Sequence, residues 1–422
     1  MTLTTSDDIY WDPYDHVVDA NAQEIWKRMR DEAPLYYNEK FDFYALTRFD
    51  DVLAVMLDTE TYSSRHATTL EIMTAEPYDV PMIIWMDPPE HTQLRKLVNR
   101  AFTPRAINDL EQRMTRICAD LLDPFVGTNG FDYVDDFGAL LPPTVILALL
   151  GFPEGREDEW RHAIDELFHQ MGASGADTAL EGGAAPDLAF RADDEAEDSL
   201  ARDPALRSTV FGLLPELIEQ RRRDPQHDLI STLVTAEVDE DGVSRTVSEA
   251  ELYSFIQVLA IAGTETVARL LSWAAVLLAR HPDQRALLVE DSGRLPNAIE
   301  ELLRYEAPSP VNARWVQRDV EFYGTTVPAG SKLILLNGAA NRDERQFPDP
   351  DRFDVQRHIE RHTSFGYGAH FCVGAALARL EGRIALQATL DRFPTWDVDE
   401  SALEWVHTST VRGFAKVPLV LP

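Results

Sequence analysis

Apolar residues recur at helical spacing along most of the chain, and one such run is longer than the others. It covers residues 248–282, where Ser248 and Glu251 have the spacing of a capping box and Pro282 follows the last periodic position. A second apolar stripe predicts a helix from 297 that stops before Pro308. Stripes of this kind need other elements to cover them, so the pattern predicts a large helical part.

Strand-like segments are short and lie near both ends of the chain. Residues 34–49 predict two strands around a polar turn, residues 320–338 predict strands joined by Gly and Pro turns, and residues 414–422 predict a final strand pair. No repeat or Gly/Ser linker divides the chain. We expect a mainly α fold with small β-sheets, built as a single domain over 1–422 with a small β-rich N-terminal part and a large helical part. Residues 172–204 are rich in Gly, Ala and acidic residues and are expected to form a flexible lid loop.

Composition narrows the class of protein. The 422 residues are 45% hydrophobic, which is enough for a large core, and the formal net charge of −33 argues against binding to nucleic acid. The N-terminus is polar and acidic, unlike a signal peptide, and apolar stretches such as 270–279 are too short to cross a bilayer. Two cysteines cannot form a disulfide framework or a four-thiolate metal site. We expect a cytoplasmic protein with no membrane anchor and no nucleic-acid partner.

The two cysteines have different surroundings. Cys118 lies at helical spacing among apolar residues, as a core residue would. Cys372 lies in the loop FGYGAHFCVG, directly before a helical stretch, where free N–H groups and the helix dipole favour a thiolate. Gly366 and Gly374 remove side chains beside it, so that backbone N–H groups can turn toward the sulfur or a flat group can lie close.

Several kinds of chemistry could use Cys372. A zinc site lacks companion thiolates, and a covalently attached c-type haem needs a second cysteine in C-x-x-C-H. A nucleophilic cysteine has no evident base with a supporting partner. The thiolate could also be the axial ligand of a haem iron. The residue types alone leave the nucleophile and the haem ligand open.

The loop around Cys372 resembles a known family signature. Phe365, Gly368, Cys372 and Gly374 match F-x-x-G-x-x-x-C-x-G, which is similar to the haem-binding signature of the cytochrome P-450 monooxygenases. The resemblance implies the fold of that family, haem b as the cofactor and Cys372 as the axial ligand of its iron. It extends over most of the chain through the motifs that follow.

The long predicted helix contains AGTETV, which resembles the family motif A-G-x-[DE]-T. Gly263 inside a helix costs about 1 kcal/mol relative to alanine and needs a reason, which close helix packing would supply. Beside a haem, Ala262 and Gly263 would instead open a groove for dioxygen. The resemblance implies that Glu265 and Thr266 relay protons, although Val267 replaces the common following threonine.

Three charged residues match a structural feature of the family. Glu301 and Arg304 lie on one face of a predicted helix and, with Arg352 downstream, correspond to a buried structural charge network.

The resemblance also implies cations that hold the haem propionates. Asp87 before two prolines predicts a helix start with the Asp side chain as its cap, and His91 and Arg95 follow on one face of that helix. Arg314 and His370 match the remaining propionate positions. The cofactor-binding residues that the resemblance implies are His91, Arg95, Ala262, Arg314, Phe365, Gly366, His370, Cys372 and Gly374.

The implied function is that of a haem-thiolate monooxygenase, which inserts one oxygen atom of O2 into a C–H bond of a lipophilic small molecule of steroid, terpenoid, fatty acid or polyketide type. The substrate-pocket residues implied are Ile84, Trp85, Val258, Ile261, Val311, Asn312 and Ser409. A peroxide-driven peroxygenase and a non-enzymatic haem sensor or carrier are the alternatives. The acid–alcohol pair Glu265–Thr266 argues against both, because neither needs a proton relay.

Electrons are expected to come from another protein. The sequence shows no flavin domain and no cysteine set for an iron–sulfur cluster, so the resemblance implies a separate ferredoxin or flavodoxin with its NAD(P)H reductase. Basic residues gather over 91–116 in an otherwise acidic chain, and Arg379 and Arg383 follow Cys372. These side chains are expected to attract an acidic electron carrier.

Overall fold

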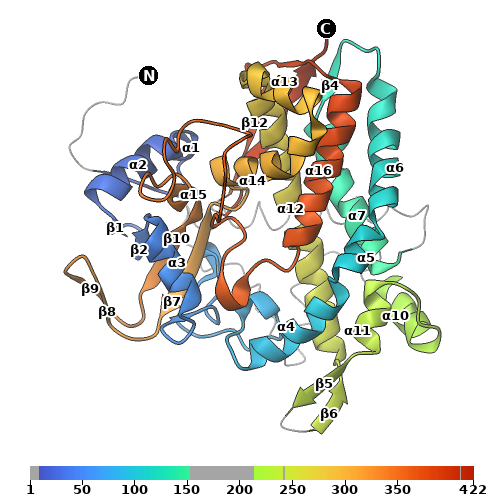
Figure 1. Ribbon diagram of the computed structural model, residues 1–422. Coiled ribbons are helices and arrows are strands. Elements are labelled where there is room, and N and C mark those ends of the chain that lie inside the picture. The colour runs from blue at the N-terminus through green and yellow to red at the C-terminus, as the bar shows by residue number, and fades with distance from the viewer. Residues whose placement is uncertain (1–8, 153–212, 241–242, 409) are drawn as a thin grey trace.

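The computed structural model describes residues 9–152, 213–240, 243–408 and 410–422, so the predicted lid at 172–204 and Ser409 lie outside the described residues. Figure 1 shows a β-rich region with the N-terminal helices on one side and most of the long helices on the other. The prediction of a mainly α fold with small β-sheets is confirmed.

A five-stranded sheet organises the β-rich region, in the order β1-β2-β10-β7-β3. Its strands are β1 (Leu35–Asn38), β2 (Phe43–Leu46), β3 (Tyr62–Ser63), β7 (Val311–Val316) and β10 (Lys332–Leu336). Strands β1 and β2 form the predicted antiparallel hairpin, and β10 is parallel to β2 and antiparallel to β7. Successive residues of β2 face opposite sides: Phe43 and Ala45 pack with Trp11 and Trp26, whereas Leu46 packs with the cluster around α3. The helices of this region are α1 (His16–Ala20), α2 (Ala22–Glu32), α3 (Phe49–Leu57) and α15 (Asn337–Ala340).

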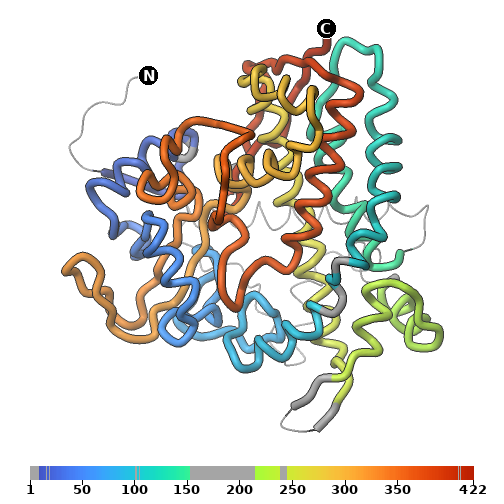
Figure 2. The backbone as a smooth tube through the Cα atoms, in the orientation of Figure 1, coloured from blue at the N-terminus to red at the C-terminus, as the bar shows by residue number. Residues whose placement is uncertain are grey.

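Helix α12 (Glu249–Arg280) runs through the helical region, as the tube in Figure 2 also shows. Its capping box, Ser248 with Glu251, is present as predicted. Every residue from Val267 to Leu278 is buried, because this half of the helix is apolar on most of its circumference and other elements surround it. The other helices of the region are α4 (Glu90–Ala101), α5 (Pro104–Asn108), α6 (Glu111–Leu122), α7 (Leu141–Leu150), α10 (Leu213–Arg223), α11 (Leu229–Val234), α13 (Pro282–Glu290), α14 (Leu295–Tyr305) and α16 (Ala375–Arg392).

The remaining strands form small sheets: β4 (Gly130–Asp132), β11 (Asp397–Val398) and β14 (Pro418–Val420) in one, β5 (Glu237–Glu240) with β6 (Val243–Thr246), β8 (Val320–Phe322) with β9 (Thr325–Val327), and β12 (Glu404–His407) with β13 (Arg412–Lys416). The prediction of strands over 320–338 is confirmed. The prediction that the last two strands pair with each other is wrong, because β13 pairs with β12 and β14 lies between β11 and β4. The two strands are nearly consecutive, and Val417 between them is buried and accepts a hydrogen bond from the Tyr133 N–H. This leaves no room for a hairpin turn.

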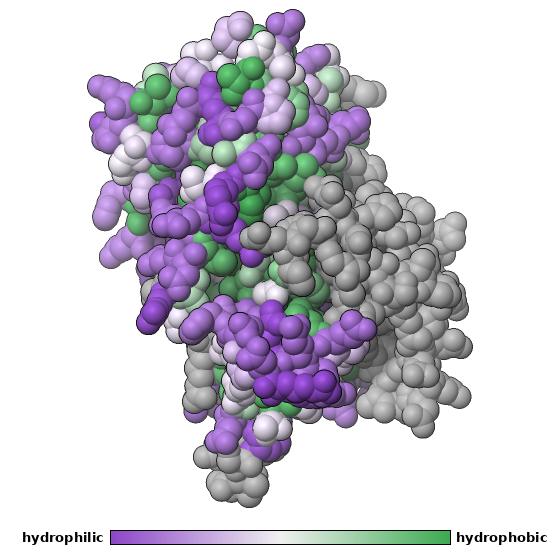
Figure 3. All heavy atoms as spheres, turned by 90° about the vertical axis from the view of Figure 1, so that its right-hand side faces the viewer, coloured by the Kyte–Doolittle hydropathy of each residue, from purple (hydrophilic) through white to green (hydrophobic). Residues whose placement is uncertain are grey.

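Polar side chains cover much of the described surface in Figure 3, with apolar residues between them. Only α12, among the described residues, is long and apolar enough to cross a membrane, and 72% of its apolar window is buried inside the protein. The apolar surface of α12 therefore packs mostly inside the protein, as in a core helix. Cys118 on α6 is fully buried in the largest hydrophobic cluster, as predicted.

Candidate active site

Cys372 lies between the short helix η9 (Gly368–His370) and α16, in a loop that the backbone holds tightly. The Cys372 N–H donates to the Phe365 carbonyl at 2.8 Å. Gly366 and Gly368 have φ angles of +65° and +70°, which side-chain-bearing residues rarely adopt. A Cβ at Gly368 would also lie 2.9 Å from the Met56 carbonyl oxygen at the end of α3. The glycines therefore let this loop turn sharply against α3.

The Cys372 sulfur has competing influences on its charge. Burial raises the pKa of the thiol, whereas the N–H groups of Gly374 and Ala375 and the cations of Arg95 and Arg379 lower that pKa. The amides at the start of α16 thus face the sulfur as the sequence suggested, but burial outweighs them for the free thiol. A metal ion that replaced the thiol proton would reverse this balance, since metals bind the thiolate form.

Four of the predicted cofactor-binding residues form a basic cluster, in which His91 and Arg314 are buried and Arg95 and His370 are partly buried. His91 on α4 is 1% exposed, and neither of its ring nitrogens has a hydrogen-bond partner among the described residues. Its ring centroid lies 4.3 Å from that of His370. Burial, with Arg95 nearby, lowers the pKa of His91 to about 4, and burial, with Arg314 nearby, lowers the pKa of His370 to about 2.

Arg314 on β7 is buried, and its one hydrogen bond in the described part of the chain is donated from Nη1 to the neighbouring Ala313 carbonyl at 2.8 Å. Burial lowers the pKa of Arg314 to about 10, and only the nearby Asp87 acts in the opposite direction. A buried guanidinium without a paired carboxylate is costly. The basic cluster therefore fits an anion, and the carboxylate groups of haem propionates have the required charge and hydrogen-bonding oxygens.

Asp87 does not cap the helix that follows, so that prediction is wrong. Its carboxylate accepts hydrogen bonds from the Ser63 hydroxyl at 2.5 Å and the Ser64 N–H at 2.9 Å. Helix α4 begins at Glu90, after both prolines. The end of β3 offers Asp87 two donors, which explains why its side chain turns away from the helix.

Arg95 connects α4 with the cysteine loop. Its Nη2 donates to the Phe371 carbonyl and its Nε donates to the Asn99 side chain at 3.1 Å. The backbone next to Cys372 is thus anchored to the helix that carries His91.

On α12, the structure gives Gly263 a packing role. A Cβ at Gly263 would lie 2.8 Å from Cδ1 of Ile146, so the glycine permits close contact between α12 and α7. This accounts for the glycine without a dioxygen groove, whereas Ala262 remains exposed. The Thr266 hydroxyl donates to the Ala262 carbonyl at 2.8 Å.

Glu265 and Thr266 are adjacent in the chain but have separate partners. The Glu265 carboxylate lies 3.0 Å from Nε of Arg269, one turn further along α12. The sequence reasoning missed Arg269, although its i, i+4 spacing from Glu265 was visible.

The buried charge network includes a different third residue from the predicted one. Glu301 and Arg304 are fully buried and pair through contacts of 2.6 and 2.9 Å. The third member is Arg357, whose Nε lies 3.3 Å from Glu301 and whose side chain is 12% exposed. The prediction for Arg352 is wrong: its side chain is 62% exposed and pairs with Asp354, and only its carbonyl accepts from Arg304.

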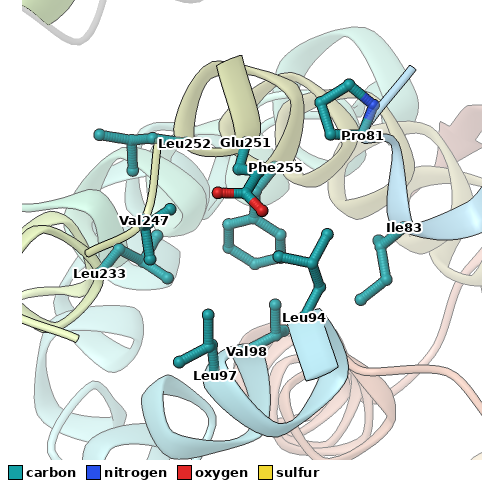
Figure 4. A pocket seen from close by; sticks show the side chains of 10 residues that line it. All are labelled: Pro81, Ile83, Leu94, Leu97, Val98, Leu233, Val247, Glu251, Leu252 and Phe255. Carbon is teal, nitrogen blue, oxygen red and sulfur yellow. The ribbon is translucent and has the colours of Figure 1, made fainter. Parts of the chain in front are cut away.

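The predicted substrate-pocket residues do not all lie together in the structure. Trp85 and Val258 pack in one cluster, whereas Val311 belongs to the cluster under the five-stranded sheet. Ile84 is exposed, and Ile261 and Asn312 are partly buried. Figure 4 shows a separate apolar pocket between α4, α11 and α12, into which Ile83, Leu94 and Phe255 point.

Comparisons with known proteins match nearly the whole chain. The family described as "Cytochrome P450" matches residues 36–404. A putative cytochrome P450 123 of Mycobacterium tuberculosis is 38% identical over 99% of this chain and 99% of its own. A vitamin D(3) 25-hydroxylase of Pseudonocardia autotrophica is 34% identical over 100% of this chain and 99% of its own.

Solved structures are similar in fold as well. Cytochrome P450 CYP109Q5 from Chondromyces apiculatus has a TM-score of 0.81 and 31% identity, with 97% of each chain covered. CYP109E1 from Bacillus megaterium in complex with testosterone has a TM-score of 0.79 and 28% identity, with 95% of this chain and 99% of that chain covered.

Proposed function

From the premise that this chain belongs to the cytochrome P450 family and is a haem-dependent monooxygenase, we propose that its substrate is a lipophilic molecule of steroid type, hydroxylated at a C–H bond. Bound haem b supplies the activation of dioxygen. The residues of this chain bind that cofactor, position the substrate and move protons.

The proposal assigns the cofactor-binding roles as the resemblance suggested. Cys372 would be the iron ligand, and His91, Arg95, Arg314 and His370 would hold the propionates. Arg95 also donates to the Phe371 carbonyl in the cysteine loop. The observation that carries this assignment is the basic cluster, in which the buried His91 has two ring nitrogens without a partner in the described chain. Such groups cost free energy unless a ligand satisfies them.

For proton movement, we assign Thr266 and Glu265. The Thr266 hydroxyl can donate or accept, and its present acceptor, the Ala262 carbonyl, lies on the same exposed face of α12. Glu265 is partly exposed and can exchange protons with water. A hydroxyl group that can donate or accept and a carboxylate with access to water are the two groups that a proton relay needs.

Two relatives support the steroid class. The name of one relative specifies vitamin D(3), and a structural neighbour was solved with testosterone. The pocket side chains that we assign are mainly apolar, with Trp85 and Val258 in contact within one cluster. Terpenoids, fatty acids and polyketides share the lipophilic chemistry and are the competing classes.

Electron supply by a ferredoxin or flavodoxin with its NAD(P)H reductase is also part of the proposal, as is a cytoplasmic location. Several basic residues near Cys372 already have acidic partners: Arg379 pairs with Glu300 at 2.6 Å and Arg383 with Glu111 at 2.8 Å. Arg105 on α5 is exposed, and α5 packs on α16. Charge reversal at Arg105 should weaken binding of an acidic carrier, most strongly at low salt.

The test combines two spectra of the purified holoprotein. The carbon monoxide difference spectrum of the reduced protein should show a strongly red-shifted Soret band, and Cys372→His should abolish that shift. Titration with testosterone and vitamin D3 should then change the iron spin state, whereas palmitate should not. A histidine-like band in the unmodified protein would refute thiolate ligation. A spin shift with palmitate and none with either steroid would refute the substrate class alone.

A further inference from the structure

Arg269 lies on α12, one turn after the acid that we assign to the proton relay. It is 6% exposed, and its Nε is 3.0 Å from the Glu265 carboxylate. Burial lowers the pKa of Arg269, and Glu265 and the more distant Asp135 oppose that effect. Because burying an unpaired guanidinium is costly, Arg269 depends on Glu265 for its place in the core.

The same guanidinium also holds a strand. Nη1 of Arg269 donates to the Phe414 carbonyl of β13. Two neighbours on this face of α12 continue the attachment: the Ser272 hydroxyl accepts from the Phe414 N–H at 3.1 Å, and Nε1 of Trp273 donates to the Arg412 carbonyl at 3.1 Å. Positions 269, 272 and 273 share one helical face, so backbone groups of β13 are hydrogen-bonded to side chains along one face of α12.

Gly413 allows this close approach. A Cβ there would lie 2.9 Å from Cδ of Arg269 and 3.0 Å from the Ser272 hydroxyl. Strand β13 therefore lies directly against the Arg269 side chain, and a shift of the strand cannot leave that side chain in place.

The backbone at the start of strand β13 is held by two hydrogen bonds. The turn before it is closed by the Val411 N–H, which donates to the Thr408 hydroxyl at 2.9 Å. The Arg412 N–H donates to the Pro308 carbonyl at 2.9 Å, in the segment that leads to Val311. The strand thus connects the segment before Val311 with the Arg269 side chain.

We propose that Arg269 is a positioning residue that couples Glu265 to strand β13, because one buried guanidinium binds both the relay acid and the strand. The relay role of Glu265 rests on the proposed function, but the coupling itself does not. Displacement of β13 would move Arg269 and so change how firmly the Glu265 carboxylate is held.

Amide hydrogen exchange of the holoprotein tests the coupling without turnover. The reporter is the peptide that contains residues 412–416. Arg269→Met keeps the aliphatic stem but removes every donor, and should speed exchange there about tenfold. Glu265→Gln keeps Arg269 but replaces its carboxylate partner with a neutral amide, and should speed exchange at least threefold. Arg269→Lys keeps the charge and should bring exchange back to within threefold of the unmodified chain.

Arg285→Met is the matched control. Arg285 is buried to the same extent, donates to the Trp396 carbonyl at 2.6 Å and stacks on the Trp396 ring, but has no contact with Glu265 or β13. Its replacement should leave exchange over 412–416 unchanged. Unchanged exchange in Glu265→Gln would overturn the proposal, because a purely structural Arg269 would hold β13 whatever the charge at position 265. This arm remains decisive if Arg269→Met does not fold, and the carbon monoxide spectrum reports separately on the proposed function.

Discussion

The charge network around Glu301 leads to a prediction that separates two arginines five positions apart. Arg357 donates from Nη1 to the Pro348 carbonyl at 2.6 Å and from Nη2 to the carbonyls of Asp349 and Arg352 at 2.8 and 2.9 Å. It also approaches Glu301 at 3.3 Å. Arg352 offers only an exposed contact of 3.5 Å to Asp354.

The magnitude follows from these contacts. A hydrogen bond to a charged group contributes about 1.5–3 kcal/mol net, and water reaches the outer nitrogens of Arg357, so the lower end applies to its three carbonyl bonds. Since Arg304 still pairs with Glu301 after the change, loss of the three carbonyl bonds in Arg357→Met should cost about 4–5 kcal/mol. Arg352→Met should cost less than about 1 kcal/mol, as for other exposed ion pairs.

The assay is thermal unfolding of the haem-loaded protein with both methionine variants at equal haem content. For a chain of this size, 1 kcal/mol corresponds to about 1–2 °C in Tm. Arg357→Met should therefore lower Tm by about 4–10 °C, and Arg352→Met should change Tm by no more than about 2 °C. Equal losses in the two variants would refute the structural assignment and restore Arg352 to the network.

Three further changes test other parts of the structure. His91 is buried and its pKa is lowered to about 4, so the imidazole of the unfolded chain takes up a proton at higher pH than that of the folded chain. The cofactor-free protein should therefore lose up to about 3 kcal/mol of stability as pH falls from 6.5 to 4. His91→Phe should reduce this loss in urea titrations and should weaken haem retention. Glu381 is buried, its Oε1 has no hydrogen-bond partner in the described chain, and burial raises its pKa to about 8. The free energy of unfolding should therefore fall by several kcal/mol as pH rises from 4.5 through 8, and Glu381→Gln should remove that fall. Gly263→Ala should cost about 1–3 kcal/mol through the contact with Ile146, and adding Ile146→Val should recover part of it; a loss that Ile146→Val does not reduce would contradict the packing role.

Local sequence patterns predicted the elements well where local chemistry decides them. The capping box at Ser248 needs only residues three apart, and the glycine-rich loop before α16 needs only its own backbone conformation. Asp87 shows the limit of such patterns. A capping residue was expected from the prolines that follow it, but the Ser63 and Ser64 donors come from a strand more than twenty positions earlier. Sequence spacing does not reveal which distant donor reaches a carboxylate first.

The same limit explains the outcome at Arg352 and Arg357. Both arginines follow Glu301 and Arg304 at suitable distances along the chain, and the order of residues does not distinguish them. The local turn decides which side chain enters the core, and here it directs the Arg352 carbonyl toward Arg304 and the Arg352 side chain toward solvent. At Gly263, in contrast, sequence allowed two explanations, and the Ile146 contact supplies the packing reason for the glycine, while the dioxygen groove stays a prediction.

The buried arginines, compared with one another, identify the part of the protein reserved for a ligand. Arg304 has Glu301 and three backbone carbonyls as partners, and Arg342 and Arg412 share the Glu306 carboxylate. Arg314 is as deeply buried but has only a neighbouring carbonyl, and it lies near His91, whose nitrogens have no partner in the described chain. Arg285 is also buried with few partners, since among the described residues it has only the Trp396 carbonyl and the Trp396 ring. The Arg314 site differs because the poorly paired guanidinium and the two unpartnered nitrogens of His91 occur together there, which favours a ligand that satisfies both. The free-energy cost of burying these unpaired groups is offset if the cofactor brings the anion that pairs with them. The cofactor would then contribute to the stability of the folded chain as well as to its chemistry.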